Sequence, residues 1–181
     1  MKGEKMIREI ISRMIQIFIG SFIFDCPILL LKLRTIGYKL VVKSIGGGVN
    51  FGRKVFFYTP HNVRKADICI GNNVGISPNV EIDCSAALTI GDYVWISQNV
   101  QIFSHTHPIK GNIVKERQRV EISKPKYIGR DAWIGANSII LPNVTYIGDN
   151  AIIGAGSVVT KNIENNMIVA GNPAVTIGKR E

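Results

Sequence analysis

Two histidines stand close together near the middle of the 181-residue chain, in the sequence Ser-His-Thr-His-Pro at 104–108. Histidine is the side chain whose ordinary pKa lies closest to neutral pH, so it can accept a proton from a hydroxyl group in the cell. His105 and His107 therefore indicate general-base chemistry, with surface histidines of no special role as the alternative. The third histidine, His61, lies in a turn-like Thr-Pro-His-Asn sequence and is interpreted as structural.

A His-x-His pair can also bind a metal ion, but a zinc site needs further ligands. Asp83 and Glu121 are the acidic residues that could supply them. The three cysteines are widely spaced and include no Cys-x-x-Cys pair, so neither a disulfide framework nor a cysteine zinc site is expected. We predict no bound metal and a reducing, cytoplasmic location.

A repeat of six residues surrounds the two histidines. Glycine often follows the repeated aliphatic residue, and a small or β-branched residue stands four places after it. The aliphatic series comprises Ile70, Ile76, Ile82 and Leu88, then Ile90, Ile96 and Ile102, then Ile128, Ile134 and Ile140, then Ile147, Ile153 and Val159, with a weaker set at Ile45, Phe51 and Phe57.

A period of six matches neither the 3.6 residues of an α-helix nor the alternation of a simple strand. It fits a coil of three short strands, in which the aliphatic residue points inward and glycine or asparagine forms the corner. Eighteen residues make one coil, and coils stack at about 4.8 Å. The chain has 30 Ile against 7 Leu, and β-branched residues favour strands. The repeat thus predicts an all-β parallel β-helix of about five coils.

The repeat is interrupted between Ile102 and Ile128, which predicts one extended loop over 103–127 that begins with the histidines. Loops of repeat proteins commonly carry function. The net charge of +9 is local: residues 1–44 carry +5, residues 108–126 carry +4, and the remainder is neutral. Such clustering argues against nucleic acid as a partner. We expect Lys115, Arg117 and Arg119 of the loop to face an anionic substrate.

Residues 1–44 form a separate apolar and basic segment. Their apolar residues follow helical spacing over 6–18, with basic and polar residues opposite. We expect a helix that packs on the remaining domain or on a neighbouring subunit, or that lies on an anionic membrane surface. The apolar stretch 10–24 is too short and interrupted for a confident membrane span, and it lacks a signal-peptide cleavage site. The predicted domain then covers 45–175, and 176–181 form a C-terminal tail.

Three segments carry a resemblance to a known family: Ile128 to Asn137, Ile153 to Lys161, and Ala170 to Ala174. The stretch from about Ile68 to Val175 resembles the hexapeptide-repeat acyltransferases, and among them the sugar and polysaccharide O-acetyltransferases of the galactoside, maltose and colanic-acid type. The resemblance implies a left-handed β-helix, acetyl-CoA as acyl donor, and a homotrimer whose cofactor site lies between neighbouring β-helices. Residues 1–44 lie outside it.

The resemblance also implies roles for individual residues on the acceptor side. His107 matches the catalytic histidine, which removes a proton from a sugar hydroxyl while that oxygen attacks the thioester, with no covalent intermediate. His105, Ser77, Asn79 and Asp83 are predicted to bind the acceptor. Ser77 replaces an asparagine of the galactoside enzymes, and Cys-Ser at 84–85 replaces their paired aspartates. A simple galactoside or maltose acceptor is therefore disfavoured.

On the cofactor side, the resemblance predicts an aromatic residue beside the pantetheine arm, small residues along it, and a Thr-Lys pair at the nucleotide end. These are Trp133, then Ala136 and Ala155, then Thr160 and Lys161. An aromatic residue that merely covers a coil edge is the alternative for Trp133. Two departures stand out: Tyr146 lengthens one hexad to seven, and Val175 replaces a basic residue, so Lys179 and Arg180 are expected to face the phosphates.

The sequence therefore predicts an acetyl-CoA-dependent O-acetyltransferase that acts on a hydroxyl of a cell-surface polysaccharide sugar or its precursor. Membrane contact through the N-terminal helix is a further expectation, at the inner face of the membrane. Two alternatives stay open, an N-acetyltransferase of an amino sugar nucleotide and a non-catalytic β-helix scaffold. A zinc enzyme like the γ-carbonic anhydrases would need three well-placed histidines.

Overall fold

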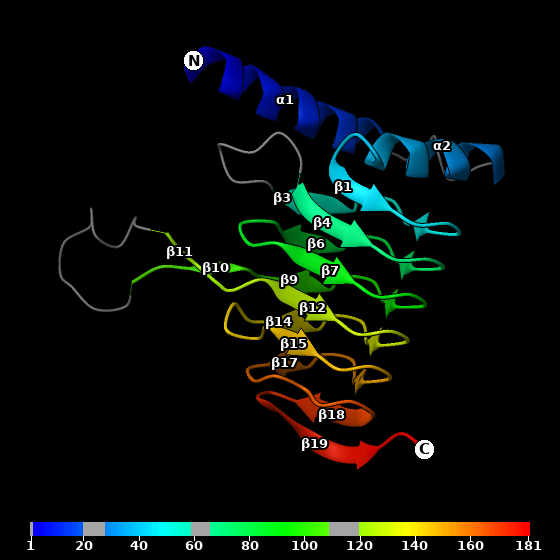
Figure 1. Cartoon of the computed structure of the whole chain (residues 1–181), viewed down its shortest axis with the longest axis vertical. Helices are drawn as coiled ribbons and strands as arrows, with labels where there is room; N and C mark the ends of the chain where they lie inside the picture. The colour runs from blue at the N-terminus through cyan, green and yellow to red at the C-terminus, as the bar shows by residue number, and fades with distance from the viewer. Residues whose placement is uncertain (1, 20–27, 59–65, 109–119) are drawn as a thin grey trace.

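The chain winds into a triangular prism built from three parallel β-sheets, with two helices across one end (Figure 1). A computed structural model describes residues 2–19, 28–58, 66–108 and 120–181. Each complete coil contributes one strand to each sheet, and each of these strands pairs in parallel with the equivalent strand of the next coil. This is the left-handed parallel β-helix of about five coils that the hexads and the family resemblance predicted.

We call the three faces sheets A, B and C. Sheet A contains β1 (Val42–Ile45), β4 (Ala66–Ile70), β7 (Leu88–Ile90), β12 (Lys126–Ile128) and β15 (Tyr146–Ile147). Sheet B contains β2 (Asn50–Phe51), β5 (Gly75–Ile76), β8 (Trp95–Ile96), β13 (Trp133–Ile134), β16 (Ile152–Ile153), β18 (Met167–Gly171) and β19 (Ala174–Lys179). Sheet C contains β3 (Phe56–Tyr58), β6 (Glu81–Asp83), β9 (Gln101–Ile102), β14 (Ile139–Ile140) and β17 (Val158–Val159).

The repeated aliphatic residues form the core. Ile90, Ile128 and Ile147 stand in register on sheet A, and Ile96, Ile134 and Ile153 do the same on sheet B. All six are at most 2% exposed. Stacking one aliphatic residue on the next coil's equivalent buries a continuous column, which is why each coil depends on its neighbours for stability.

The corners explain why the chain is rich in asparagine and glycine. At the edge between sheets B and C, the equivalent residues Asn79, Asn99 and Asn137 each have a φ of 59°. Asparagine tolerates this left-handed backbone better than most residues. Their side chains also form a ladder, because the Asn79 amide donates to Asn99 (3.0 Å) and the Asn99 amide donates to Asn137 (2.9 Å).

The hexad lengthened by Tyr146 makes a wider corner between Ile140 and Ile147. Lys126 begins β12 in register with Leu88, so its side chain replaces an aliphatic residue of the core. It is buried, and its ammonium donates to the carbonyls of Leu141 (3.1 Å), Pro142 (2.8 Å) and Val144. A buried ammonium group thus closes the seven-residue corner from within.

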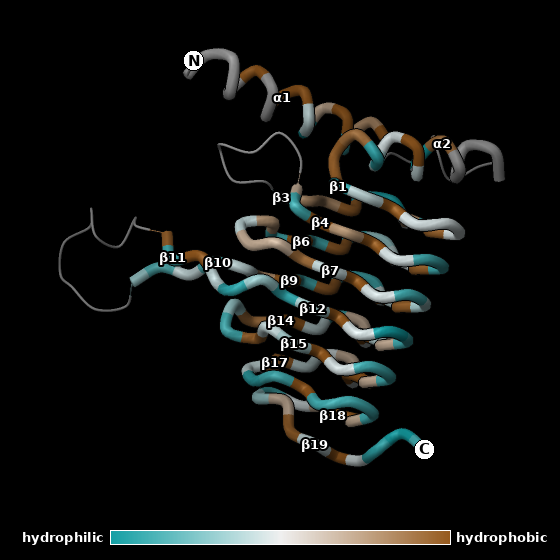
Figure 2. Tube along the Cα trace, in the orientation of Figure 1, coloured by the Kyte–Doolittle hydropathy of each residue, from teal (hydrophilic) through white to brown (hydrophobic). Residues whose placement is uncertain are grey.

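The helices α1 (Lys2–Ile19) and α2 (Ile28–Tyr38) cover the first coil. The Gln16 side chain accepts from the backbone N–H of Phe57 (2.7 Å), and Arg34 donates to the Ile19 carbonyl (2.8 Å). Most of the predicted apolar face points the other way: Ile7, Ile10, Ile11, Met14 and Phe18 are exposed, whereas Ile15 is half-buried and packs against the core. Figure 2 marks the hydrophobic positions of α1 in brown. The helix does pack on the domain, through Gln16, Ile15 and Ile19, but most of the predicted face takes no part. Within the described residues, no helix is long and apolar enough to span a membrane.

The predicted boundaries fall close to elements of the fold. The first coil begins at Val42, three residues before the expected start, and β12 begins at Lys126, one residue before the expected end of the loop. Residues 176–179 belong to β19, which pairs antiparallel with β18 and closes the far end of the prism. The part of the loop that the structure describes forms a short ribbon, β10 (His105–Thr106) paired antiparallel with β11 (Glu121–Ile122).

Candidate active site

The two histidines lie on the prism edge between sheets C and A, which we call the histidine edge. β6 ends at Asp83, and β9 of the next coil leads through residue 103 into the ribbon that starts at His105. Coiling therefore brings Asp83 and His105 together although 22 residues separate them in sequence. The ribbon leaves the prism at this point, to the left in Figure 1.

The Asp83 carboxylate is the centre of the cluster. One oxygen, Oδ1, accepts from the backbone N–H of Ser85 (2.9 Å) and from its hydroxyl (2.7 Å). The other, Oδ2, accepts from the backbone N–H of Ser104 (2.8 Å) and lies 2.5 Å from Nδ1 of His105. Each oxygen thus has two partners, and the carboxylate is only 6% exposed.

These bonds keep the carboxylate ionised. Burial by itself would raise the pKa of Asp83, but the hydrogen bonds from Ser85, Ser104 and His105 outweigh it and lower that pKa below its ordinary value. Burial raises the pKa of the neighbouring Cys84 thiol, and the Asp83 charge adds to this. Cys84 is therefore held as a thiol, which disfavours it as a nucleophile.

Ser104 anchors the start of the ribbon to the prism. Its hydroxyl donates to the Asp83 carbonyl (2.8 Å) and accepts from the backbone N–H of Ala86 (3.0 Å). Ser104 is buried, so these bonds are shielded from water. The backbone is thus fixed immediately before His105.

The ring of His107 stands perpendicular to that of His105, at 90° with 5.5 Å between the ring centroids. The His105 side chain is 34% exposed and His107 is exposed, so a substrate can reach both imidazoles from solvent. The arrangement offers a carboxylate, an oriented imidazole and a second, accessible imidazole. Such a group can accept a proton from a hydroxyl.

The structure does not bring all the predicted acceptor residues together. Asp83 and His105 meet, but Ser77 and Asn79 lie at the edge between sheets B and C, before β6 begins. Asp83 ends β6, so about 13 Å of extended chain separates it from Asn79. The Asn79 side chain is a member of the asparagine ladder, which gives it a structural role.

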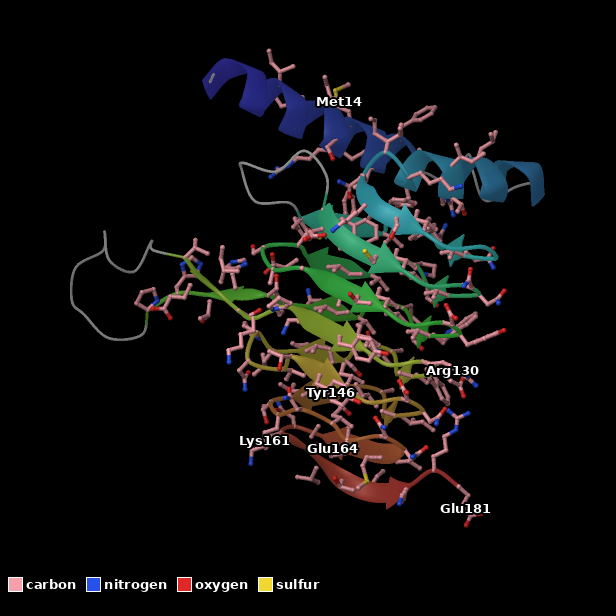
Figure 3. All side chains as sticks on the ribbon, in the orientation of Figure 1. Met14, Arg130, Tyr146, Lys161, Glu164 and Glu181 are labelled. Atoms are coloured by element: carbon pink, nitrogen blue, oxygen red, sulfur yellow. The ribbon has the colours of Figure 1, made fainter. Side chains whose placement is uncertain are left out.

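The predicted cofactor residues divide between two edges of the prism. Trp133 lies on sheet B, and Ala136 and Ala155 follow it at the edge between sheets B and C. Thr160 and Lys161 follow β17 on the histidine edge, where Lys161 is exposed on the same side as the ribbon (Figure 3). Within one chain, the width of sheet C separates the two groups.

One aromatic residue was missed in the sequence. Trp95 on β8 is in register with Trp133 on β13, and the two side chains are 55% and 50% exposed. Trp133 donates from Nε1 to the Ser97 hydroxyl (3.1 Å), and Trp95 lies over Gly75, where a Cβ would meet its ring at 2.5 Å. The repeated Trp-Ile pair at 95–96 and 133–134 was the available signal.

The residues that were predicted to face anions lie in different places. Lys115, Arg117 and Arg119 lie outside the described residues. Arg180 pairs with the Asp131 carboxylate (2.9 Å), while Lys179 is exposed at the end of β19. In the described ranges, no three His, Cys, Asp or Glu side chains gather as a metal-binding group would.

Comparisons with known proteins agree with this fold. Residues 125–161 match the family model for the bacterial transferase hexapeptide, six repeats. WcaF of Escherichia coli K12, which carries the name of a colanic acid biosynthesis acetyltransferase, is 32% identical over 126 residues that cover 61% of this chain and 69% of that protein. Galactoside O-acetyltransferase of the same strain is 41% identical over 112 residues, covering 62% of this chain and 54% of that one.

Among solved structures, a galactoside acetyltransferase in complex with coenzyme A superposes with a TM-score of 0.78 at 25% identity, over 98% of this chain and 82% of that one. Other curated relatives, from Dictyostelium discoideum, Saccharomyces cerevisiae and Rhizobium leguminosarum, are matched over 46%, 57% and 40% of their own length. The chain thus spans about half the length of these relatives.

Proposed function

The chain belongs to the hexapeptide-repeat acetyltransferases, and on that premise we propose that it transfers an acetyl group from acetyl-CoA to a hydroxyl of a cell-surface polysaccharide sugar or its precursor. The observation that carries the proposal is the pair of imidazoles on the histidine edge, one accessible and one bonded to a buried carboxylate. The acetyltransferase names of the relatives and the coenzyme A complex of a similar structure support the donor.

In the proposed mechanism, His107 accepts the proton of the sugar hydroxyl while the hydroxyl oxygen attacks the thioester carbonyl carbon. The new C–O bond forms as the carbonyl π electrons move to the oxygen, which gives a tetrahedral oxyanion. Its collapse breaks the C–S bond, and the departing thiolate takes the proton from the His107 imidazolium. No covalent enzyme intermediate is needed, in keeping with the raised pKa of the Cys84 thiol.

A thiol-release assay with acetyl-CoA and a panel of glycans tests the proposal. Wild type should release coenzyme A in the presence of one class of acceptor. The His107→Ala variant should lose about 10²- to 10⁴-fold of the rate, which is the usual contribution of a positioned general base. His61→Ala is the matched control and should retain activity. Activity that survives in His107→Ala would rule out this base.

The acceptor class is decided by the same assay. Sugars with a free hydroxyl and amino sugar nucleotides are offered separately, and the product is analysed by mass before and after mild alkali. An O-acetyl ester is removed by alkali, whereas an N-acetyl amide survives it. We expect the alkali-labile product. A stable product would instead favour the N-acetyltransferase alternative.

The division of the cofactor residues supports a site completed between neighbouring copies, as in the homotrimer that the family resemblance implied. Within one chain, His107 and Lys161 lie on the histidine edge, and Trp133 lies beyond sheet C. A second copy, packed so that its sheet B edge faces the first copy's histidine edge, brings both groups into one groove. Each site then uses His107 of one chain and Trp133 of another.

Complementation between inactive variants tests this sharing. His107→Ala and Trp133→Ala chains are unfolded together, mixed in equal amounts and refolded. About a quarter of the wild-type activity should return, because one site in four then draws an intact residue from each of two randomly chosen neighbours. Each variant refolded alone stays low and serves as the control. Mixed samples no more active than the separate ones would contradict a shared site.

The outer face of α1 supports membrane contact by the same chain. Ile7, Ile10, Met14 and Phe18 are 48–64% exposed on it, and residues 1–44 carry a net charge of +5. An apolar helix face with basic residues in the same segment binds anionic lipid surfaces. Flotation with phosphatidylserine vesicles tests it: wild type should float, and Met14→Gln with Phe18→Gln should not. A wild type that stays in solution would contradict the contact.

A further inference from the structure

Asp83 and His105 make more hydrogen bonds within the protein than acceptor binding requires. The Asp83 carboxylate accepts four hydrogen bonds, and three of its donors are the Ser104 backbone N–H and the two groups of Ser85. These donors belong to two successive coils. The carboxylate therefore cannot rotate to follow a substrate, and it presents one fixed acceptor direction to His105.

That direction determines the tautomer of His105. An ionised carboxylate oxygen only accepts hydrogen bonds, so the 2.5 Å contact requires the proton to sit on Nδ1 of His105. The neutral ring then keeps its lone pair on Nε2. The Ser85 hydroxyl, 3.4 Å from Nδ1, adds a second polar neighbour on the same side of the ring.

The oriented ring in turn contacts His107. β10 ends at Thr106, so His107 is the first residue beyond the paired part of the ribbon. Its ring stands at 90° to the ring of His105, which Asp83 holds. A fixed neighbour of this kind restricts the orientations open to an exposed imidazole, and orientation is a large part of what an active site provides.

We propose that Asp83 is a positioning residue that acts through His105: it fixes the ring and tautomer of His105, which holds the imidazole of His107 in the orientation that accepts the substrate proton. This inference rests on the proposed function for its effect on rate. Two further charged groups lie close to the cluster, the Lys126 ammonium from β12 and Glu121 from β11.

The first measurement needs no variant and no activity. Long-range ¹H–¹⁵N correlation on histidine-labelled protein reports which ring nitrogen carries the proton, and the chain has only three histidines to assign. At pH 8.5, about two units above the ordinary histidine pKa, the rings are compared in their neutral form. We expect His105 to be protonated on Nδ1. Protonation on Nε2 would overturn the inference, whatever the enzyme does.

The second measurement separates positioning from binding. In Asp83→Asn, one backbone N–H must face an amide NH₂, and the negative charge is lost. We expect kcat to fall by at least about tenfold, but by no more than the 10²- to 10⁴-fold that a general base contributes, with both KM values within about twofold. An unchanged kcat with a raised acceptor KM would instead make Asp83 a binding residue and overturn the proposal.

Two His105 variants test the same proposal if Asp83→Asn folds poorly. His105→Asn retains a donor toward Asp83 but removes the ring, and His105→Phe retains a ring but loses the donor. Both should lose kcat, because both the bond and the ring are needed. Full activity in either variant would overturn the inference.

Asp67→Asn is the matched control, since Asp67 pairs with Lys43 on the surface of sheet A. If wild type releases no thiol at all, the proposed function fails while the tautomer measurement still stands.

Discussion

We expect Lys126 to give the stability of this protein an unusual dependence on pH. The side chain is 5% exposed, and its ammonium is surrounded by the carbonyls of Leu141, Pro142 and Val144. Burial lowers the pKa of Lys126 from 10.5 to about 8, although the Asp83 charge partly opposes it. In the unfolded chain the group returns to a pKa of about 10.4.

The sign follows from proton binding. Between about pH 8 and pH 10.5, the unfolded state holds the Lys126 proton more tightly than the folded state. The free energy of unfolding therefore rises with pH across that window, and the gain is lost as the pH falls through 8. A shift of about 2.5 units corresponds to about 3 kcal/mol over the whole window, and to about 2 kcal/mol between pH 7 and pH 9.5.

Urea unfolding of wild type, Lys126→Met and Lys124→Met at pH 7 and pH 9.5 measures this effect. Methionine has a similar length and no titrating group. The difference between the free energies of unfolding of wild type and Lys126→Met should therefore shift by about 2 kcal/mol in favour of wild type from pH 7 to pH 9.5. Lys124 is exposed two residues earlier and provides the matched control. Lys124→Met should keep the pH dependence of wild type, because Lys126 is intact in that variant.

The ¹³Cε resonance of Lys126 gives a second, direct readout. Its titration midpoint should lie near 8, as the buried ammonium requires. A midpoint above 10 would refute the lowered pKa of Lys126, if wild type and Lys126→Met also differ by the same free energy of unfolding at both pH values. It would mean that water reaches the ammonium in the core or that the three carbonyls compensate fully for burial.

Three further outcomes are expected. Gly46→Ala should lower the free energy of unfolding by about 1–3 kcal/mol in urea, because its Cβ would lie 2.6 Å from the Gly71 carbonyl oxygen. Gly47→Ala should change little, since its nearest contact is at 3.7 Å; equal effects would contradict the close approach of the coils. Ile134→Ala should lower the free energy of unfolding by about 2–5 kcal/mol, and Ile152→Ala should lower it clearly less because Ile152 is half-buried. Equal losses would mean that the buried column is not the stabilising core. Lys161→Ala should raise the KM for acetyl-CoA without changing kcat, and should weaken the salt dependence of that KM; an unaltered KM would remove Lys161 from the nucleotide end.

The coil architecture could be predicted from sequence because its cause is local. A β-branched residue every six positions, with glycine or asparagine between, specifies strand, corner and inward side for each coil without long-range information. The interruption between Ile102 and Ile128 predicted an extended loop for the same reason, but not that its described ends pair as the β10–β11 ribbon. The burial of Lys126 could also have been predicted from the sequence. Lys126 stands two residues before Ile128, as Leu88 stands two residues before Ile90, so a charged residue occupies a core column.

The site was less predictable because its contacts join different coils. Asp83 and His105 were both singled out, yet their bond depends on where β6 ends relative to the start of the ribbon. The hexads do not determine where the ribbon starts, since 21 residues and a complete coil lie between the two. For Asn79 the difficulty was the opposite: its neighbours in the chain suggested a ligand-binding residue, whereas its φ of 59° and its ladder bond show a corner residue.

The orientation of α1 shows why a helical apolar stripe is an unreliable guide at the end of a β-helix. The first coil has no preceding coil, so backbone groups of its strands would be left without partners where the stack ends. Polar side chains meet that need: Gln16 bonds to both backbone groups of Phe57, Arg34 donates to the Phe51 carbonyl (3.1 Å), and Tyr38 donates to the Val55 carbonyl (2.7 Å). Helices that cap a strand edge present hydrogen-bonding residues inward. In α1 most of the apolar stripe therefore faces outward for another surface, while Ile15 and Ile19 pack on the core beside Gln16.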